Sequence, residues 1–548
     1  MQFQRWEILL LTLVSVFTIA MRIPAISFAL PDVEGADDRY MLVPALKIAS
    51  LQEPATQFGL PDSTLFYGYG IVFRGVFEIL DLANLTSATH PLDDYLNHHA
   101  IWPLMTVRVL NIAWTLGALF LLYVISRRWY NRTVAATTVV VLSFSSMLLE
   151  HTLYARPDIP SMAFVLLVLW FAIQIHDRGR VKDYLLAGIG MGLAVATKYP
   201  LVLTVIPVVI AHGSRVLTGS ASDLQRPANS AWKKWKLLLL CAGVSFIAFS
   251  IATPLFWPML PRAIEQIRWE ARATHPGADG LSFFGNLQFY LTHVLNYGIG
   301  TLIAALSIVG IIRAIRTDRI KTCILFSFPI FTLLVLSFHR LHWDRWMIPT
   351  LPFLALGAGI GMHWIWSRVP KQFSTVVAFA VLAVITIAPP MLRMARVEFA
   401  FTENETREVA REWLERNTLP DARIVREPYT PSLRKPGISE QEVPAIGAKN
   451  DVAYQNDKID YFVSNVELRE RFYASPDTFP VFKIYYDNLL SQSQLIQRIE
   501  VPEELQWGST IAVSDWNILR PKQSFATQFG PTIEIYAFSE RAKTYARD

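Results

Sequence analysis

Long apolar stretches separated by short polar turns dominate the first 394 residues of this 548-residue chain. A helix that crosses a bilayer needs about 20 mostly apolar residues. Eleven stretches meet or approach that requirement: residues 8–29, 101–125, 133–150, 159–175, 184–198, 200–213, 237–256, 290–312, 322–338, 346–366 and 374–394. The fifth and sixth are short and meet at Lys198-Tyr199-Pro200, so they could be thin spans or a broken pair. The pattern predicts an α-helical polytopic membrane protein with about eleven transmembrane helices.

The first apolar stretch, Ile8–Met21, also has the length of a signal-peptide core. Only Arg5 precedes it, and no convincing small-residue cleavage site follows. We therefore interpret it as the first transmembrane helix.

Basic residues gather in alternate loops between these stretches, which orients the chain in the bilayer. They are Arg127, Arg128, Arg132, Arg178, Arg180, Lys182, Arg215, Arg226, Lys233, Lys234, Lys236, Arg313, Arg316, Arg319, Lys321, Arg368 and Lys371. Loops rich in Lys and Arg face the cytoplasm, so the N-terminus is expected there and the C-terminus outside. The loop of residues 30–100 and the tail of residues 395–548 then face outward, as does Pro261–Arg272, a predicted amphipathic interfacial helix. We expect the plasma (inner) membrane of a prokaryote, with the outer parts in the periplasm or the cell exterior.

The tail differs in composition from the rest of the chain, changing from apolar to mixed at about Arg393. Residues Glu403–Asn417 predict an amphipathic helix, with Val409, Trp413 and Leu414 spaced for one face. Three short strands are predicted at Ala422–Glu427, Ile459–Asn465 and Thr532–Phe538. We predict a small α/β domain over residues 395–548, attached to a membrane domain over residues 1–394.

Composition narrows the class of protein. Charged residues make up 17% of the chain, against about 25% in soluble proteins. The net charge of +5 does not indicate nucleic acid, because the basic residues lie in short loops between apolar stretches. Cys241 and Cys323 lie in or beside apolar stretches, which excludes a disulfide framework or a thiolate metal site.

Candidate chemistry begins in the first outer loop, where Asp32, Glu34, Asp37 and Asp38 lie within seven residues of one another at the membrane boundary. One of Asp37 and Asp38 could instead cap a helix running through Tyr40–Ala49. Capping requires one carboxylate rather than four, and anions beside a bilayer are costly. The segment therefore favours a functional role.

Further candidates lie in the other outer turns: Arg156, Asp158, Lys198, His275 and Arg345. Each also has a simpler interpretation. Arg156 and Asp158 could form an interfacial ion pair at a helix start, Lys198 could extend to the membrane surface, and His275 and Arg345 could be loop residues. Taken together they supply a carboxylate base and several cations at one depth. That set suits transfer from a phosphate-activated donor, since Arg binds phosphate oxygens bidentately and a base can deprotonate an acceptor hydroxyl.

Five segments resemble the GT-C membrane glycosyltransferases, in the branch of protein O-mannosyltransferases and the aminoarabinose transferase that acts on lipid A. They are Asp37-Asp38-Arg39-Tyr40, His151–Asp158, Gly192–Pro200, Arg345–Pro352 and Thr406–Ile424. The resemblance implies a polyprenyl- or dolichyl-phosphate sugar donor, inversion at the anomeric carbon, and a first-loop Asp as base, which carries over to Asp37. Asp38 stands where the family commonly has Glu, so which of the two carboxylates faces the acceptor is open. Asp158 matches a position that supports the acceptor or a metal.

The resemblance leaves several points open. Some members of the family use a divalent metal and some do not, so no cofactor is certain and no metal ligand is assigned. The acceptor could be a lipid, a glycan or a protein hydroxyl. Two other functions compete with the transferase. A transporter or lipid flippase would use Arg22 and Arg108 within the spans, and a membrane-anchored binding protein would work through its tail.

Overall fold

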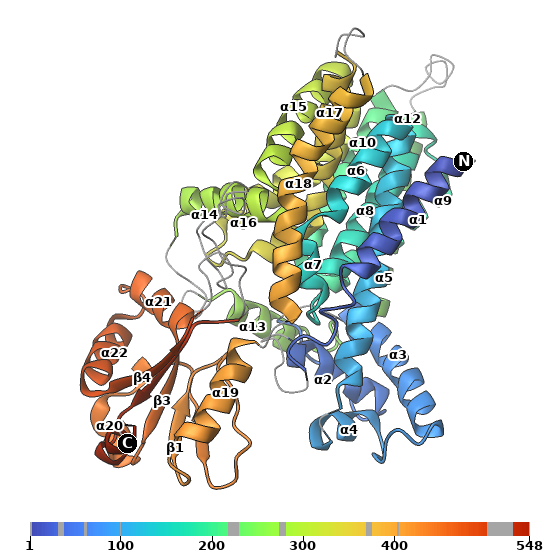
Figure 1. The fold of residues 1–548 in the computed structure, drawn as a ribbon. Helices are drawn as coiled ribbons and strands as arrows, with labels where there is room; N and C mark the ends of the chain where they lie inside the picture. The colour runs from blue at the N-terminus through green and yellow to red at the C-terminus, as the bar shows by residue number, and fades with distance from the viewer. Residues whose placement is uncertain are drawn as a thin grey trace.

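The computed structural model describes residues 3–30, 38–59, 63–98, 100–217, 229–272, 281–368, 375–402, 405–500 and 530–546. Figure 1 shows a bundle of long helices, with the C-terminal α/β part and the helices between residues 38 and 97 at one end of it. The chain is a predominantly helical membrane protein.

Each predicted span corresponds to helical structure. The elements are α1 (Arg5–Ala20), α5 (Trp102–Trp129), α6 (Arg132–Ser143), α7 (Ser146–Thr152), α8 (Asp158–Asp177), α9 (Val181–Thr197), η1 (Tyr199–Thr204), α10 (Val205–Leu217), α12 (Asn229–Ala252), η2 (Tyr290–Ile299), α15 (Thr301–Thr317), α16 (Arg319–Phe338), η3 (Asp344–Thr350), α17 (Leu351–Trp366) and α18 (Thr375–Thr402). Among the described residues, six helices are long and apolar enough to cross a membrane, or up to eight if each bent pair counts as one span. Helices α1 and α9, with 16 and 17 residues, are shorter than a typical span. The total of eleven stays a prediction.

Two of the predicted spans are sharply bent. The α6–α7 pair bends by 57°, and the segment Phe283–Ile299 meets α15 at 107°. Gly300 lies at the second bend with φ of 89°, a conformation that glycine adopts without the steric cost of a Cβ. The short fifth and sixth stretches are separate helices, since α9 ends at Thr197 and a 3₁₀ turn, η1, leads into α10.

The first outer loop folds into helices whose small apolar core also includes Leu104 and Val107 of α5 and Ala155. It contains α2 (Asp38–Ala49), α3 (Ser63–Leu82) and α4 (Pro91–Asn97). The amphipathic helix predicted over Pro261–Arg272 is present as α13 (Leu260–Glu270), followed by α14 (Phe283–Phe289). Its place at the membrane interface stays a prediction. The backbone N–H of Phe58 donates to the Gln266 side chain of α13 at 2.6 Å, so these two outer segments are in contact.

The C-terminal part contains a five-stranded sheet in the order β2-β1-β3-β5-β4. The strands are β1 (Arg423–Arg426), β2 (Ser439–Glu442), β3 (Tyr461–Asn465), β4 (Gln494–Ile499) and β5 (Ile533–Ala537). Strand β1 is parallel to β2 and β3, and β5 is antiparallel to β3 and β4. The helices are α19 (Thr406–Asn417), α20 (Asp451–Asn456), α21 (Val466–Ala474), α22 (Pro480–Gln492) and α23 (Glu540–Tyr545). The helix and the three strands predicted in the tail are therefore all present.

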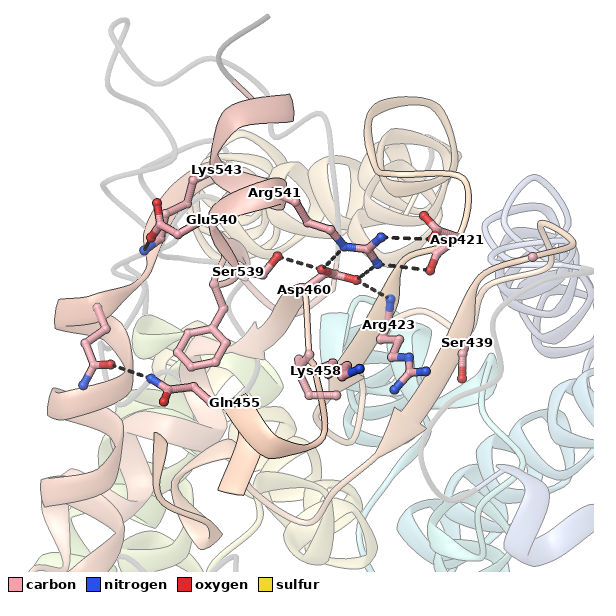
Figure 2. A pocket seen from close by; sticks show the side chains of 14 residues that line it. Asp421, Arg423, Ser439, Gln455, Lys458, Asp460, Ser539, Glu540, Arg541 and Lys543 are labelled. Carbon is pink, nitrogen blue, oxygen red and sulfur yellow. Dashed lines mark hydrogen bonds and ion pairs between the residues drawn. The ribbon is translucent and has the colours of Figure 1, made fainter. Parts of the chain in front are cut away.

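Alternate residues of the central strands pack into two apolar clusters, as a sheet covered on both faces requires. Phe462 belongs to one cluster and its neighbours Tyr461 and Val463 to the other. A cavity of about 1100 Å³ lies at one end of the strands, beside the starts of β1, β2 and β3, and Figure 2 shows the side chains that line it. Its buried Asp460 accepts hydrogen bonds from Arg541 at 2.5 and 2.7 Å, which ties β3 to the segment after β5.

Candidate active site

Asp158, in the first turn of α8, lies at the centre of a buried ion-pair network. Lys198 Nζ donates to Asp158 Oδ1 at 2.5 Å, and Arg345 Nε lies 3.9 Å from Asp158 Oδ2. The carboxylate is 2% exposed, whereas the side chains of Lys198 and Arg345 are 13% and 19% exposed. A buried carboxylate thus holds two cations that still reach the surface of the site. Three residues that are distant in sequence therefore come together here.

The local backbone explains how these cations are placed. Lys198 follows the last residue of α9, where the chain turns from a helix into extended backbone before η1. Arg345 lies in the first turn of η3, and its backbone N–H donates to the Asp344 side chain at 2.6 Å. Pro157 directly precedes α8, so its fixed φ angle favours the helix start that carries Asp158. Three chain turns therefore meet at one carboxylate.

A second set of hydrogen bonds fixes the turn of residues 153–157 beside α8. Arg108 donates to the carbonyl oxygens of Leu153, Ile26 and Phe28 at 2.7, 2.5 and 2.9 Å. Asn111 donates to the Tyr154 carbonyl at 2.9 Å. Because these donors lie on the long helix α5, the turn is held by a rigid element of the bundle.

Asp38 is buried and is bonded to the same turn of residues 153–157. Its Oδ1 accepts from the backbone N–H of Ala155 at 2.6 Å, and the residue is fully buried in the first turn of α2. Asp38 therefore connects the first outer loop to the turn that carries Arg156 and Asp158. Asp37 and His275 lie outside the described residues, as do Asp32 and Glu34.

Arg156 and the residues before it lie beside the ion-pair network of Asp158. The Arg156 guanidinium lies 4.4 Å from the ring centre of Tyr154 and interacts electrostatically with Glu150 and His151. Glu150 accepts a hydrogen bond from the Tyr297 hydroxyl of η2. Arg156 is thus close to the network and packs on the Tyr154 ring.

Sequence reasoning missed three polar residues beside the ion-pair network: Glu150, Tyr297 and Asp344. Asp344 Oδ1 lies 4.0 Å from His151 Nε2. A signal for Glu150 was present, because an acidic residue at the end of an apolar span is costly and often functional. Tyr297 carries no such signal, since a tyrosine in an apolar stretch is ordinary.

Two tryptophan rings lie beside these cations. Lys198 Nζ lies 6.0 Å from the Trp346 ring centre, and the Arg345 guanidinium lies 5.1 Å from that of Trp343. Cations over tryptophan faces are attracted by the ring quadrupole. Arg471, from the C-terminal part, lies 4.6 Å from the Trp343 ring centre and was not among the predicted site residues.

The arrangement combines Lys and Arg side chains with buried carboxylates that orient them, which suits binding of a phosphate group. Within the described part of the chain, no group of three or more His, Cys, Asp or Glu residues could hold a metal ion. No metal ligands are therefore assigned.

Arg22 and Arg108, the residues on which a transport function would depend, are both buried and bonded to the protein. Arg22 donates to the Thr18 carbonyl at 2.9 Å and to the Thr152 hydroxyl at 3.2 Å. Arg108 makes the three carbonyl contacts described above. Both guanidinium groups brace the end of the bundle that carries the ion-pair network and so have a structural explanation.

Comparison with known proteins gives the family context of this site. Residues 103–257, which include Asp158 and Lys198, match the family described as dolichyl-phosphate-mannose-protein mannosyltransferase. No curated protein sequence matches the chain.

Several solved structures share the fold at low sequence identity. The Archaeoglobus fulgidus oligosaccharyltransferase AglB, solved with an inhibitory peptide and a dolichol-phosphate, is 12% identical with a TM-score of 0.53, over 88% of this chain and 72% of that one. The same enzyme in complex with Zn and sulfate has a TM-score of 0.52, over 96% of this chain and 88% of that one, at 12% identity. ArnT from Cupriavidus metallidurans bound to undecaprenyl phosphate is 16% identical with a TM-score of 0.46, over 75% and 72% of the two chains.

Proposed function

We propose that this chain, whose residues 103–257 match the family described as dolichyl-phosphate-mannose-protein mannosyltransferase, is a GT-C membrane glycosyltransferase that transfers a monosaccharide from a polyprenyl- or dolichyl-phosphate donor to an acceptor hydroxyl. The transfer takes place at the outer face of the membrane and inverts the anomeric carbon. The acceptor is a lipid, a glycan or a protein.

The observation that carries this proposal is the buried Asp158 with Lys198 and Arg345 on its two oxygens. Two cations held by one carboxylate are already oriented before substrate arrives, so they need little rearrangement to stabilise charge on a leaving phosphate. Lys198 and Arg345 are assigned to the donor phosphate, and Asp158 orients them. Arg156, on the adjacent turn, and His275 are the further candidates for phosphate binding.

Asp37 is the proposed general base. Asp38 is committed to the Ala155 N–H, which favours its neighbour Asp37 as the carboxylate that faces the acceptor. Asp37 takes the proton from the acceptor hydroxyl, and the acceptor oxygen then attacks the anomeric carbon. The bond from that carbon to the phosphate oxygen breaks, and the lipid phosphate leaves with both bonding electrons. The configuration of the anomeric carbon is inverted as a result.

The solved oligosaccharyltransferase with bound dolichol-phosphate supports a lipid-phosphate ligand for this fold. The positions of the basic loops support an outer-face site, because Lys198 and Arg345 lie at the opposite ends of their helices from those loops. On the same reasoning, the N-terminus is cytoplasmic and residues 395–548 are outside, at the plasma membrane.

The test is transfer by the purified protein in detergent. A panel of radiolabelled polyprenyl-phosphate sugars is offered with a crude cell-envelope acceptor. The proposal predicts release of free polyprenyl phosphate and movement of label to acceptor with at least one donor. Saturable lipid binding without transfer from any donor would instead favour a flippase.

A further inference from the structure

One tryptophan of the outer turn contacts cations from two separate parts of the chain. The Arg345 guanidinium lies 5.1 Å from the Trp343 ring centre, and the Arg471 guanidinium lies 4.6 Å from it. Arg345 belongs to η3 of the membrane part, whereas Arg471 belongs to α21 of the α/β part. Trp343 is therefore a point where the α/β part reaches the ion-pair network around Asp158.

Arg471 is presented by a firmly anchored helix. The Asn465 side chain caps α21 by accepting from the Leu468 N–H at 3.1 Å. Leu468 and Phe472 are buried in the apolar cluster of the sheet. Glu467 accepts from the Thr532 N–H with both carboxylate oxygens at 3.0 Å, which fixes the first turn of α21 to the strand β5 segment. Side chains on such packed helices are positioned more accurately than those on loops.

Trp343 directly precedes η3, the turn that presents Arg345 to Asp158. The Trp343 carbonyl accepts from the Trp346 N–H at 3.1 Å, so the ring and the turn form one local structure. Holding Trp343 from the α/β side limits the positions that the Arg345 guanidinium can take. Arginine loses less freedom on binding when its planar group is already stacked.

We infer that Arg471 is a positioning residue of the donor-phosphate site, acting through Trp343 on Arg345. The inference rests on the proposed function and deepens it, because it makes the α/β part a component of donor binding rather than an independent domain. Figure 1 shows α21 on the side of the α/β part that faces the helix bundle, consistent with this contact.

The test compares Arg471→Leu, Arg471→Lys and Trp343→Ala with wild type. Arg416→Leu is the matched control, because Arg416 lies in an exposed ion pair with Glu412 of the same α/β part, away from Trp343. Binding of radiolabelled undecaprenyl phosphate and the donor KM and kcat are measured for each. A lost cation–π contact predicts about three- to tenfold weaker lipid-phosphate binding and a matching rise in KM for Arg471→Leu.

Three further outcomes decide the inference. Arg471→Lys retains most of the affinity for undecaprenyl phosphate, because a positive charge still lies over the Trp343 ring. Trp343→Ala weakens binding at least as much as Arg471→Leu, and the double variant is no weaker than Trp343→Ala alone, because both act through one ring. Binding by Arg471→Leu equal to that of Arg416→Leu would overturn the inference.

The binding assay separates this inference from the proposed function. If wild type binds undecaprenyl phosphate but transfers no sugar from any donor, the proposed transfer reaction fails while the Arg471 effect is still decided. If wild type does not bind the lipid phosphate at all, both are overturned.

Discussion

Replacing Lys198 by Met gives the most informative test of the ion-pair network. Met keeps much of the length and apolar volume of the Lys side chain but removes its charge. Asp158 then loses the partner at 2.5 Å and retains only Arg345, whose Nε is 3.9 Å away. The carboxylate is 2% exposed, so water cannot readily replace the lost ammonium group.

The magnitudes follow from burial. Removing one partner of a buried ion pair typically costs about 3–5 kcal/mol, and the remaining Arg345 places Lys198→Met near the lower end, about 3 kcal/mol. Loss of one preorganised charge-stabilising group raises an activation barrier by about 3 kcal/mol. At about 1.4 kcal/mol per tenfold change, this is a loss of roughly 10²-fold in kcat/KM.

The double variant Lys198→Met with Asp158→Asn separates the two effects. Removing both charges leaves no unpaired buried ion, so thermal stability in detergent should return most of the way to wild type. Transfer activity should stay low, because the phosphate has lost its cation. Lys47→Met is the matched control, since Lys47 pairs with Glu53 at 2.9 Å on an exposed part of the outer region.

Two results would refute this reasoning. Wild-type stability in Lys198→Met would mean that Lys198 extends to the membrane surface and does not neutralise Asp158. Recovery of both stability and transfer in the double variant would mean that the pair is structural only.

Three other perturbations have defined outcomes. Arg345→Lys should lower kcat/KM by about tenfold or more in the transfer assay, because Lys cannot reproduce a stacked, bidentate contact; an unchanged rate would make Arg345 an interfacial anchor. Arg108→Met should lower thermal stability by about 3 kcal/mol or more, since it leaves three buried carbonyl oxygens without their donor; little change would contradict the bracing role. Burial alone would raise the pKa of Asp460, but hydrogen bonds from Arg541 and others lower it below its usual range. Its stabilisation of the α/β part is therefore present above about pH 3.9 and lost as the pH falls through the lowered pKa, and acid unfolding of Asp460→Asn followed by circular dichroism should lack this component.

Apolar length and periodicity were enough to predict the helical segments of the spans, together with one helix and three strands of the tail. They did not predict α3 and α4, which lie between the first two spans. Strand β2, with the sequence Ser-Glu-Gln-Glu, has no apolar residue and lies at the sheet edge with mostly exposed side chains. It was not predictable, because nothing in its pattern alternates. Strand β4 forms the opposite edge of the sheet, and all but one of its side chains are at least partly exposed.

The candidate site was predictable in its residue types but not in its pairing. The positive-inside rule placed Asp158, Lys198 and Arg345 on the same face, because sidedness depends only on the order of spans and loops. It could not show that Lys198 bonds to Asp158, since their distance is set by how α8 and α9 pack. Asp38 illustrates the same point, because its bond to the Ala155 N–H depends on the fold of the first outer loop. Arg471 could not be found at all from the pattern of apolar spans, since it comes from α21 of the α/β part.

The most direct test of the account is transfer by Asp37→Asn beside wild type, with the lipid-phosphate donor that the panel identifies. Asn keeps the size of the side chain but cannot accept the acceptor proton. General-base catalysis typically supplies about 10²–10⁴-fold in rate, so the account predicts a loss of kcat of that order, with undecaprenyl phosphate binding and expression near wild type. Full transfer activity in Asp37→Asn would contradict the assignment of Asp37 as the base.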